Sequence, residues 1–142
     1  MKALKIIGVL ISIFVVLLLI AVAYLKLFLP NVGTAPVVKI EATPERLERG
    51  KYLAENVTVC VDCHSTRDFT KYAGPIKAGP FGGGGEEFGH DFGFPGFFYS
   101  RNITPSHLSS WTDGEIVRAV TSGVSKDGTA LFPLMNYLSF GN

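Results

Sequence analysis

The sequence predicts an all-α protein in which an N-terminal transmembrane helix precedes a small helical domain. Residues 6–25 are 20 consecutive uncharged and mostly apolar residues, the length of helix that crosses a hydrocarbon core of ~30 Å. Cap motifs, described below, mark two further helices. We therefore expect a transmembrane anchor over residues 1–29, a linker over residues 30–42 and one domain over residues 43–142.

The orientation of the anchor follows from the charges around it. Lys2 and Lys5 precede the apolar run, and positive residues favour the cytoplasmic side, so the domain is expected outside the cytoplasm. A cleaved signal peptide is the alternative, because Ala21-Val22-Ala23 is similar to a signal-peptidase site. The apolar character continues as far as Leu29, which favours an anchor that stays attached.

The two helices of the domain are marked by their ends. Thr43 is placed to cap a helix with Pro44 in its first position, and that helix should end before Val57. A second helix is predicted after Thr112, which forms a capping box with Glu115, and Gly123 stands where such a helix ends. The segment between them, residues 73–100, is rich in Gly, Phe and Pro and is predicted to be an irregular loop that wraps a prosthetic group.

The residues that carry chemistry are Cys60-Val61-Asp62-Cys63-His64. This C-x-x-C-H pattern is the attachment signature of a c-type haem. Each thiol can add across one haem vinyl group, and the histidine that follows can bind the iron through a ring nitrogen. The sequence contains 2 cysteines and one such motif, so we expect one covalent haem c.

Two other interpretations of the cysteine pair are weaker. A structural zinc site needs four ligands, usually two pairs, and the sequence has one Cys pair with His90 and His107 too far apart to form the second. A thioredoxin-like redox pair would need alternating strands and helices around the motif, which the sequence does not indicate.

Met135 is the expected second axial ligand. It is the one methionine beyond the initiator, and it follows Pro133, which stiffens the approach. A thioether opposite a histidine raises the haem potential and suits electron transfer. A lone methionine is also common in core packing, and His90 or His107 could bind the iron instead.

The charge pattern excludes nucleic acid as a partner. Of 13 basic residues, Lys2, Lys5 and Lys26 lie in or before the anchor, so residues 31–142 carry 10 basic and 12 acidic residues, a net charge of −2. No basic stripe is present.

Several separate motifs resemble the cytochrome c subunit of membrane-bound bacterial alcohol, aldehyde and gluconate dehydrogenases. They are Tyr99-Ser100-Arg101-Asn102-Ile103-Thr104-Pro105, Trp111-Thr112-Asp113, Asp127-Gly128 and Leu131-Phe132-Pro133-Leu134-Met135. The resemblance covers about residues 45–140 and implies a class I cytochrome c domain. Subunits of that family usually carry three haem motifs, whereas this chain has one.

The resemblance also implies roles for individual residues. Arg101 and Asn102 would lie near a haem propionate, Trp111 against the haem edge, and Met135 on the iron. The Gly74-Pro75 pair is similar to the family segment whose proline carbonyl accepts the N–H of the haem-binding histidine, and such a bond would orient His64.

A class I domain closes with a C-terminal helix that crosses the first helix, and the sequence ends seven residues after Met135. We therefore expect that helix to be missing and the chain to be a fragment of a reading frame that continues by roughly 15 to 30 residues. A partner subunit that supplies the helix is the alternative. Either case predicts an exposed apolar face at Leu47, Tyr52 and Leu53.

Together these features predict a membrane-anchored mono-haem cytochrome that carries single electrons in a periplasmic respiratory chain and is not itself an enzyme. The expected location is the bacterial inner membrane, with a single pass and the haem domain facing the periplasm. The expected partners are redox proteins, namely a dehydrogenase, an oxidase or a respiratory complex. Two alternatives stay open: a haem subunit of a larger dehydrogenase or terminal oxidase complex, and a haem enzyme or gas sensor with an open iron site.

Overall fold

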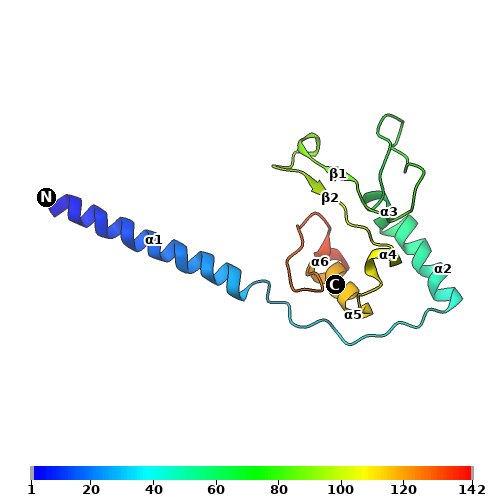
Figure 1. The fold of residues 1–142 in the computed structure, drawn as a ribbon, viewed down its shortest axis with the longest axis horizontal. Coiled ribbons are helices and arrows are strands. Elements are labelled where there is room, and N and C mark those ends of the chain that lie inside the picture. Colours follow the sequence, from blue (N-terminus) through cyan, green and yellow to red (C-terminus); the bar gives the residue numbers. More distant parts are fainter. Residues whose placement is uncertain (1, 142) are drawn as a thin grey trace. The chain divides into compact units, whose positions relative to one another are not determined.

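The computed structural model describes residues 2–141, apart from the side chain of Leu138. The chain divides into two compact units, one formed by residues 1–38 and 113–142 and the other by residues 39–112. Most of the regular secondary structure is helical, and one two-stranded sheet lies in the second unit (Figure 1). The mostly helical character and the long N-terminal helix agree with the prediction, whereas the all-α class I cytochrome c fold and the expected domain boundaries stay predictions.

The predicted N-terminal helix is present as α1, Lys2–Phe28 (Figure 1). Its 27 residues contain no buried side chain, and a helix of that length is about 40 Å long. Among the described residues, α1 is the one helix long and apolar enough to cross a membrane, although a signal sequence would pass the same test.

Segment 33–36, part of the predicted linker, lies against α5 (Asp113–Ser122) within the first unit. The Arg118 guanidinium donates hydrogen bonds to the carbonyls of Gly33 (3.4 Å) and Ser125 (2.7 Å). At Gly114 a side chain would meet the Pro36 carbonyl, so this approach requires glycine. The linker is thus held on a helix here rather than lying free.

The end of α5 agrees with its predicted cap. Gly123 adopts a left-handed conformation (φ 66°) directly after the helix, and its carbonyl accepts the N–H of Leu131 at 2.8 Å. Val124, in an isolated bridge with Ala130, is buried. The short helix α6, Tyr137–Phe140, follows Met135.

In the second unit, helix α2 (Pro44–Tyr52) begins as predicted, with the Thr43 hydroxyl accepting the Arg46 N–H. A π-helical turn, η1 (Leu53–Val57), follows α2 directly. The helical run therefore includes Val57, whereas the sequence predicted that it ends before this residue. Leu47 and Tyr52 are 61% and 51% exposed, and Leu53 is partly covered. The exposed apolar face is therefore confirmed at two of its three predicted positions.

The segment predicted to be an irregular loop contains a hairpin. Strands β1 (Glu87–Phe88) and β2 (Phe98–Tyr99) pair antiparallel and flank the 3-10 turn η2, His90–Phe92. Aromatic rings pack against one another along this hairpin, Phe88 on Phe92 at 5.6 Å and Phe94 on Phe98 at 5.8 Å between centroids. Such contacts stabilise a hairpin whose strands are too short to be evident from alternation alone.

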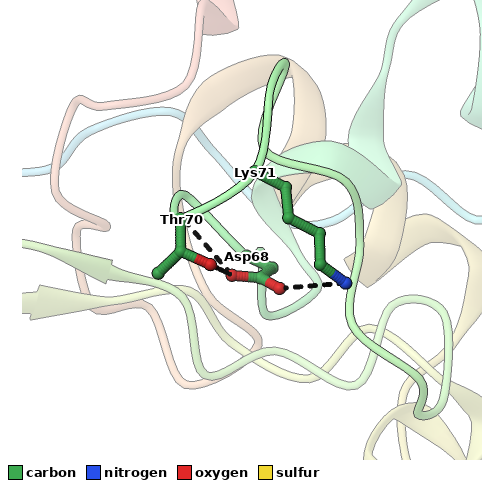
Figure 2. A network of polar contacts seen from close by, with 3 residues as sticks. All are labelled: Asp68, Thr70 and Lys71. Carbon is green, nitrogen blue, oxygen red and sulfur yellow. Dashed lines mark hydrogen bonds and ion pairs between the residues drawn. The ribbon is translucent and has the colours of Figure 1, made fainter.

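The loop from Arg67 to Ile76 starts and ends at an isolated β-bridge. Polar contacts around Asp68 lie within this loop (Figure 2). The Asp68 carboxylate accepts the Thr70 hydroxyl at 2.5 Å and the Thr70 N–H at 3.2 Å, and it pairs with Lys71 at 3.4 Å. The hydrogen bond from the Thr70 hydroxyl is the main cause of the lowered pKa of Asp68. The ionised carboxylate therefore favours this loop at neutral pH, and that contribution is lost as the pH falls through the lowered pKa.

Candidate haem-binding site

The two cysteines lie at the two ends of one helical turn, α3, Cys60–Cys63. Residues three apart lie on one face of a helix, so both side chains project from the same side of the turn. Both thiols are free, Cys60 being partly and Cys63 largely exposed. The Thr58 hydroxyl donates to the Leu53 carbonyl at 2.9 Å and lies 3.1 Å from the Cys60 sulfur, which ties the motif to the preceding helical run.

Val59, directly before Cys60, has a left-handed backbone (φ 48°, ψ 36°). A β-branched residue rarely adopts this conformation, because its Cβ approaches the following carbonyl. The bend at this one residue separates η1 from α3. Strain of this kind is often found where a functional group has to be aimed.

His64 is held at both its backbone and its ring. Its N–H donates to the Cys60 carbonyl at 2.9 Å, which caps α3. Its ring Nδ1 lies 2.7 Å from the Arg101 carbonyl, which can only accept, so Nδ1 carries the proton. In the neutral imidazole Nε2 then keeps its lone pair, which is the form that binds a metal ion.

The acceptor of this bond differs from the one that the resemblance implied. The Pro75 carbonyl accepts the Asp68 N–H at 2.8 Å, and the Arg101 carbonyl takes the place expected for it beside His64. The Pro75 carbonyl is thus bound within its own loop and not to the His64 ring. The predicted haem contact of Pro75 itself stays a prediction.

A glycine-rich segment, Gly82–Glu86, joins the haem motif to the Arg101 segment, and we refer to it as the strap. On one side the Gly84 N–H donates to the His64 carbonyl at 2.7 Å, and the Gly82 N–H donates to the Ser65 hydroxyl at 2.9 Å. On the other side the Gly85 N–H donates to the Ser100 carbonyl at 2.9 Å. Ser65, Gly82 and Gly84 are buried, so these bonds form the interior of the unit.

Glu86 ends the strap as a buried carboxylate that is 6% exposed. It accepts the Arg67 backbone N–H at 2.7 Å. The Arg67 guanidinium is directed elsewhere, to the carbonyls of Gly74 and Ala73, both at 2.6 Å. Glu86 therefore holds the chain just after His64 through a charge-assisted hydrogen bond to the backbone.

The surroundings of Cys63 disfavour its thiolate. Partial desolvation is the main cause that raises the pKa of the Cys63 thiol, and the Asp62 charge raises it further. Within the described residues no group of three His, Cys, Asp or Glu is placed to hold a metal ion.

The other predicted site residues are distributed over both units. Asn102 uses its amide oxygen to accept the Thr104 N–H (2.8 Å) and hydroxyl (2.7 Å) ahead of α4, Pro105–Leu108. Trp111 follows α4 and is partly exposed. Met135 belongs to the first unit, so its part as an axial ligand stays a prediction.

Both rival ligands lie in the second unit. His90 donates through Nδ1 to the Phe94 carbonyl at 3.0 Å and packs edge-on to Phe97, while His107 is exposed on α4.

Sequence reasoning missed the Arg101 carbonyl, the buried Ser65 and Glu86, and the part played by the strap. The run of four glycines was a usable signal, because Gly82, Gly84 and Gly85 all have positive φ. No local pattern marks Glu86 as buried, since its partner is a backbone group in a distant segment.

Comparisons with known proteins agree with the resemblance. The chain is 33% identical over 112 residues to the cytochrome c subunit of alcohol dehydrogenase (quinone) from Gluconacetobacter polyoxogenes, and 31% identical over 120 residues to the gluconate 2-dehydrogenase cytochrome c subunit from Pantoea cypripedii. The matches cover 76% and 82% of this chain. It is also 32% identical over 99 residues, 68% of this chain, to a nicotinate dehydrogenase subunit from Pseudomonas putida.

The chain spans about a fifth to a quarter of the first two relatives, 21% and 24%, and 7% of the third. No model of a known protein family matches it. The chain therefore resembles a segment of the cytochrome c subunits of alcohol and gluconate dehydrogenases, and its haem motif lies within the second unit.

We predict that Val59→Gly stabilises the folded protein by about 1 kcal/mol or less. Glycine removes the left-handed penalty of ~1–2 kcal/mol. Part of this gain is offset because glycine loses more backbone entropy on folding than valine does. The matched control is Val57→Gly in η1, which should destabilise by roughly 0.5–1 kcal/mol because glycine disfavours helical backbone. Urea unfolding measures both changes, and a loss of stability in Val59→Gly as large as in the control would contradict the strain at Val59.

Proposed function

We propose that the chain is a membrane-anchored mono-haem cytochrome c that carries single electrons and makes or breaks no substrate bond itself. The observation that carries the proposal is the geometry of His64. His64 directly follows the Cys60–Cys63 turn, and its Nδ1–H donates a hydrogen bond to the Arg101 carbonyl. The lone pair of Nε2 is therefore available to bind iron. Two thiols on one face of a turn followed by such an imidazole are the donor set that a haem c requires.

In this proposal each residue has one task. Cys60 and Cys63 form thioethers with the haem, and His64 binds its iron. When bound, the haem supplies a one-electron Fe(III)/Fe(II) couple. The Arg101 carbonyl keeps the proton on Nδ1 and orients the ring.

Further residues complete the proposed site on the strength of the resemblance. Met135 would supply a second ligand to the iron, and the side chains of Arg101 and Asn102 would bind a propionate. Trp111 would border the haem, and Pro75 lies in the loop that follows the motif.

The interior of the second unit agrees with an apolar prosthetic group. Its buried positions are occupied by glycine, Ser65 and Glu86 rather than by large apolar side chains. Large aromatic side chains of the same unit are exposed, among them Phe69 (57%), Phe81 (61%) and Phe97 (59%). The chain itself buries few apolar side chains in this unit. A porphyrin that covered the exposed rings would add buried apolar surface to it.

The relatives favour an electron carrier as part of a larger enzyme. Their names give different substrates, namely alcohol, gluconate and nicotinate, although the same chain is similar to a segment of all three. A segment that is similar in enzymes with different substrates is expected to serve a step that these enzymes have in common. Electron transfer is such a step. We propose a dehydrogenase as the redox partner, with an oxidase or another respiratory complex as the alternative.

We place the haem domain in the periplasm of a bacterium, anchored in the inner membrane by α1. The uncharged apolar run and the lysines that precede it support this topology. Haem is attached to C-x-x-C-H motifs outside the cytoplasm, and this orientation delivers Cys60 to that side.

We predict that haem remains on the polypeptide after extraction with acidified acetone. The thioethers to Cys60 and Cys63 are covalent, so extraction should remove none of the haem from protein matured in a host that attaches haem c. The matched controls are Cys60→Ala and Cys63→Ala, each of which leaves one thioether and shifts the pyridine haemochrome band. Haem that washes out of the unmodified protein would sink the proposed function.

We predict that Met135→Ala lowers the reduction potential by on the order of 0.1 V, part of the roughly 0.8 V range that axial ligands set. Loss of the thioether should also abolish the sulfur–iron charge-transfer band and allow carbon monoxide to bind. Leu134→Ala, next to it and 41% exposed, is the control and should change neither. An unchanged oxidised spectrum in Met135→Ala would assign the position to His90 or His107, and ready binding of carbon monoxide to unmodified protein would indicate an open iron site.

We predict that α1 remains attached in the mature protein. Membranes washed with alkaline carbonate should retain the protein, because a spanning helix of 27 residues does not dissociate. Leu17→Arg is the control and should weaken insertion by roughly 2.5–3.5 kcal/mol. A mature protein that starts at Tyr24 would instead show that a signal peptide is cleaved after Ala23.

A further inference from the structure

The strap touches the haem motif and the Arg101 segment at successive residues. The Gly84 N–H reaches the His64 carbonyl (2.7 Å), and the Glu86 carboxylate reaches the Arg67 N–H (2.7 Å). In the other direction the Gly82 carbonyl accepts the Ile103 N–H at 2.8 Å, and the Glu86 carbonyl accepts the Ser100 N–H at 2.9 Å. The strap thus sets the distance between His64 and the backbone that carries the Arg101 carbonyl.

Gly84 is the point of closest approach. A Cβ atom there would lie 2.6 Å from the Asn102 nitrogen, and 2.7 Å from the Arg101 carbonyl carbon and from the Ser100 oxygen. All three are backbone atoms, so no side-chain rotation could relieve the contact. The Arg101 carbonyl carbon bears the oxygen that accepts the His64 ring proton, and any side chain at position 84 has to displace it.

We propose that the strap is a positioning element for the iron-binding histidine, with Gly84 as its spacer and Ser65 and Glu86 as its anchors. The inference rests on the proposed function and adds the cause of the ring geometry. The strap fixes His64 at its carbonyl, and through residues 100–103 it fixes the acceptor of the ring proton. Because a bond from Nδ1–H to a carbonyl raises the basicity of the imidazole, the strap also lowers the reduction potential of the bound haem.

The substitution Gly84→Ala in the holoprotein tests this inference, with Gly93→Ala as a matched control. Gly84 and Gly93 have nearly the same backbone φ (76° and 79°), so both substitutions place alanine at a positive φ that L residues rarely adopt. At Gly93 nothing lies within 4 Å of the added Cβ, so only Gly84→Ala brings the clash. We expect Gly84→Ala to raise the reduction potential and to speed the exchange of the His64 ring proton several-fold in NMR spectra, while Gly93→Ala matches the unmodified protein.

Haem content, read from the pyridine haemochrome, separates the possible failures. If the unmodified protein carries no covalent haem, the proposed function fails. If haem is present and Gly84→Ala leaves both the potential and the ring-proton exchange unchanged, the strap has no positioning role. An equal change in Gly93→Ala also overturns the inference, because it would assign the effect to backbone strain.

If Gly84→Ala yields no holoprotein, Ser65→Ala decides. It removes the hydroxyl that accepts the Gly82 N–H and adds no atom that could clash. We expect faster exchange of the Gly82 amide and of the His64 ring proton, together with an upward shift in potential. An unchanged ring proton in Ser65→Ala holoprotein would overturn the positioning role.

Discussion

The hydrogen bond from the His64 ring to the Arg101 carbonyl is the contact on which the second unit is organised. It joins residues 37 apart in sequence at 2.7 Å. The His64 carbonyl is bound by Gly84 at the same time, so one residue is held at its ring and at its backbone. An imidazole fixed in this way has one tautomer and one direction for its free nitrogen, and these are the properties that an axial ligand needs.

The interior of that unit is polar and glycine-rich. Ser65 and Glu86 are buried, whereas Val124, in the other unit, is the one large apolar residue buried among those the structure describes. Buried polar groups are tolerated when they are bonded, and both residues are bonded to backbone N–H groups. A unit of this kind gains little from apolar contacts of its own, so a haem attached as we propose would have a structural as well as a chemical part in it.

What could be predicted from the sequence is what depends on neighbouring residues. Thr43 and Pro44 start α2, and Gly123 ends α5, because capping is decided within one turn. The strap could not be placed in the same way. Gly84 contacts a residue 20 positions earlier, and Ser65 contacts one 17 positions later, so their roles depend on how distant segments meet.

The haem motif itself follows from spacing, but the partner of its histidine does not. The resemblance pointed to the Pro75 carbonyl, and the structure has the Arg101 carbonyl in that position. Both are backbone oxygens, which every residue possesses, so side-chain patterns cannot distinguish them.

Two unusual backbone positions of the second unit lie before and after His64 in the sequence. Val59 bends into a left-handed conformation before Cys60, and Gly84 fills a space that admits no Cβ beside Arg101. Local preference alone would not choose valine for the first position, and the approach of a distant segment admits only glycine at the second. Val59 departs from local rules in a way that is often found where a side chain has to be aimed, and it lies close to the residue that we assign to the iron. The aim of His64 is thus supported from both ends of the motif, by the bend that precedes it and by the strap that follows.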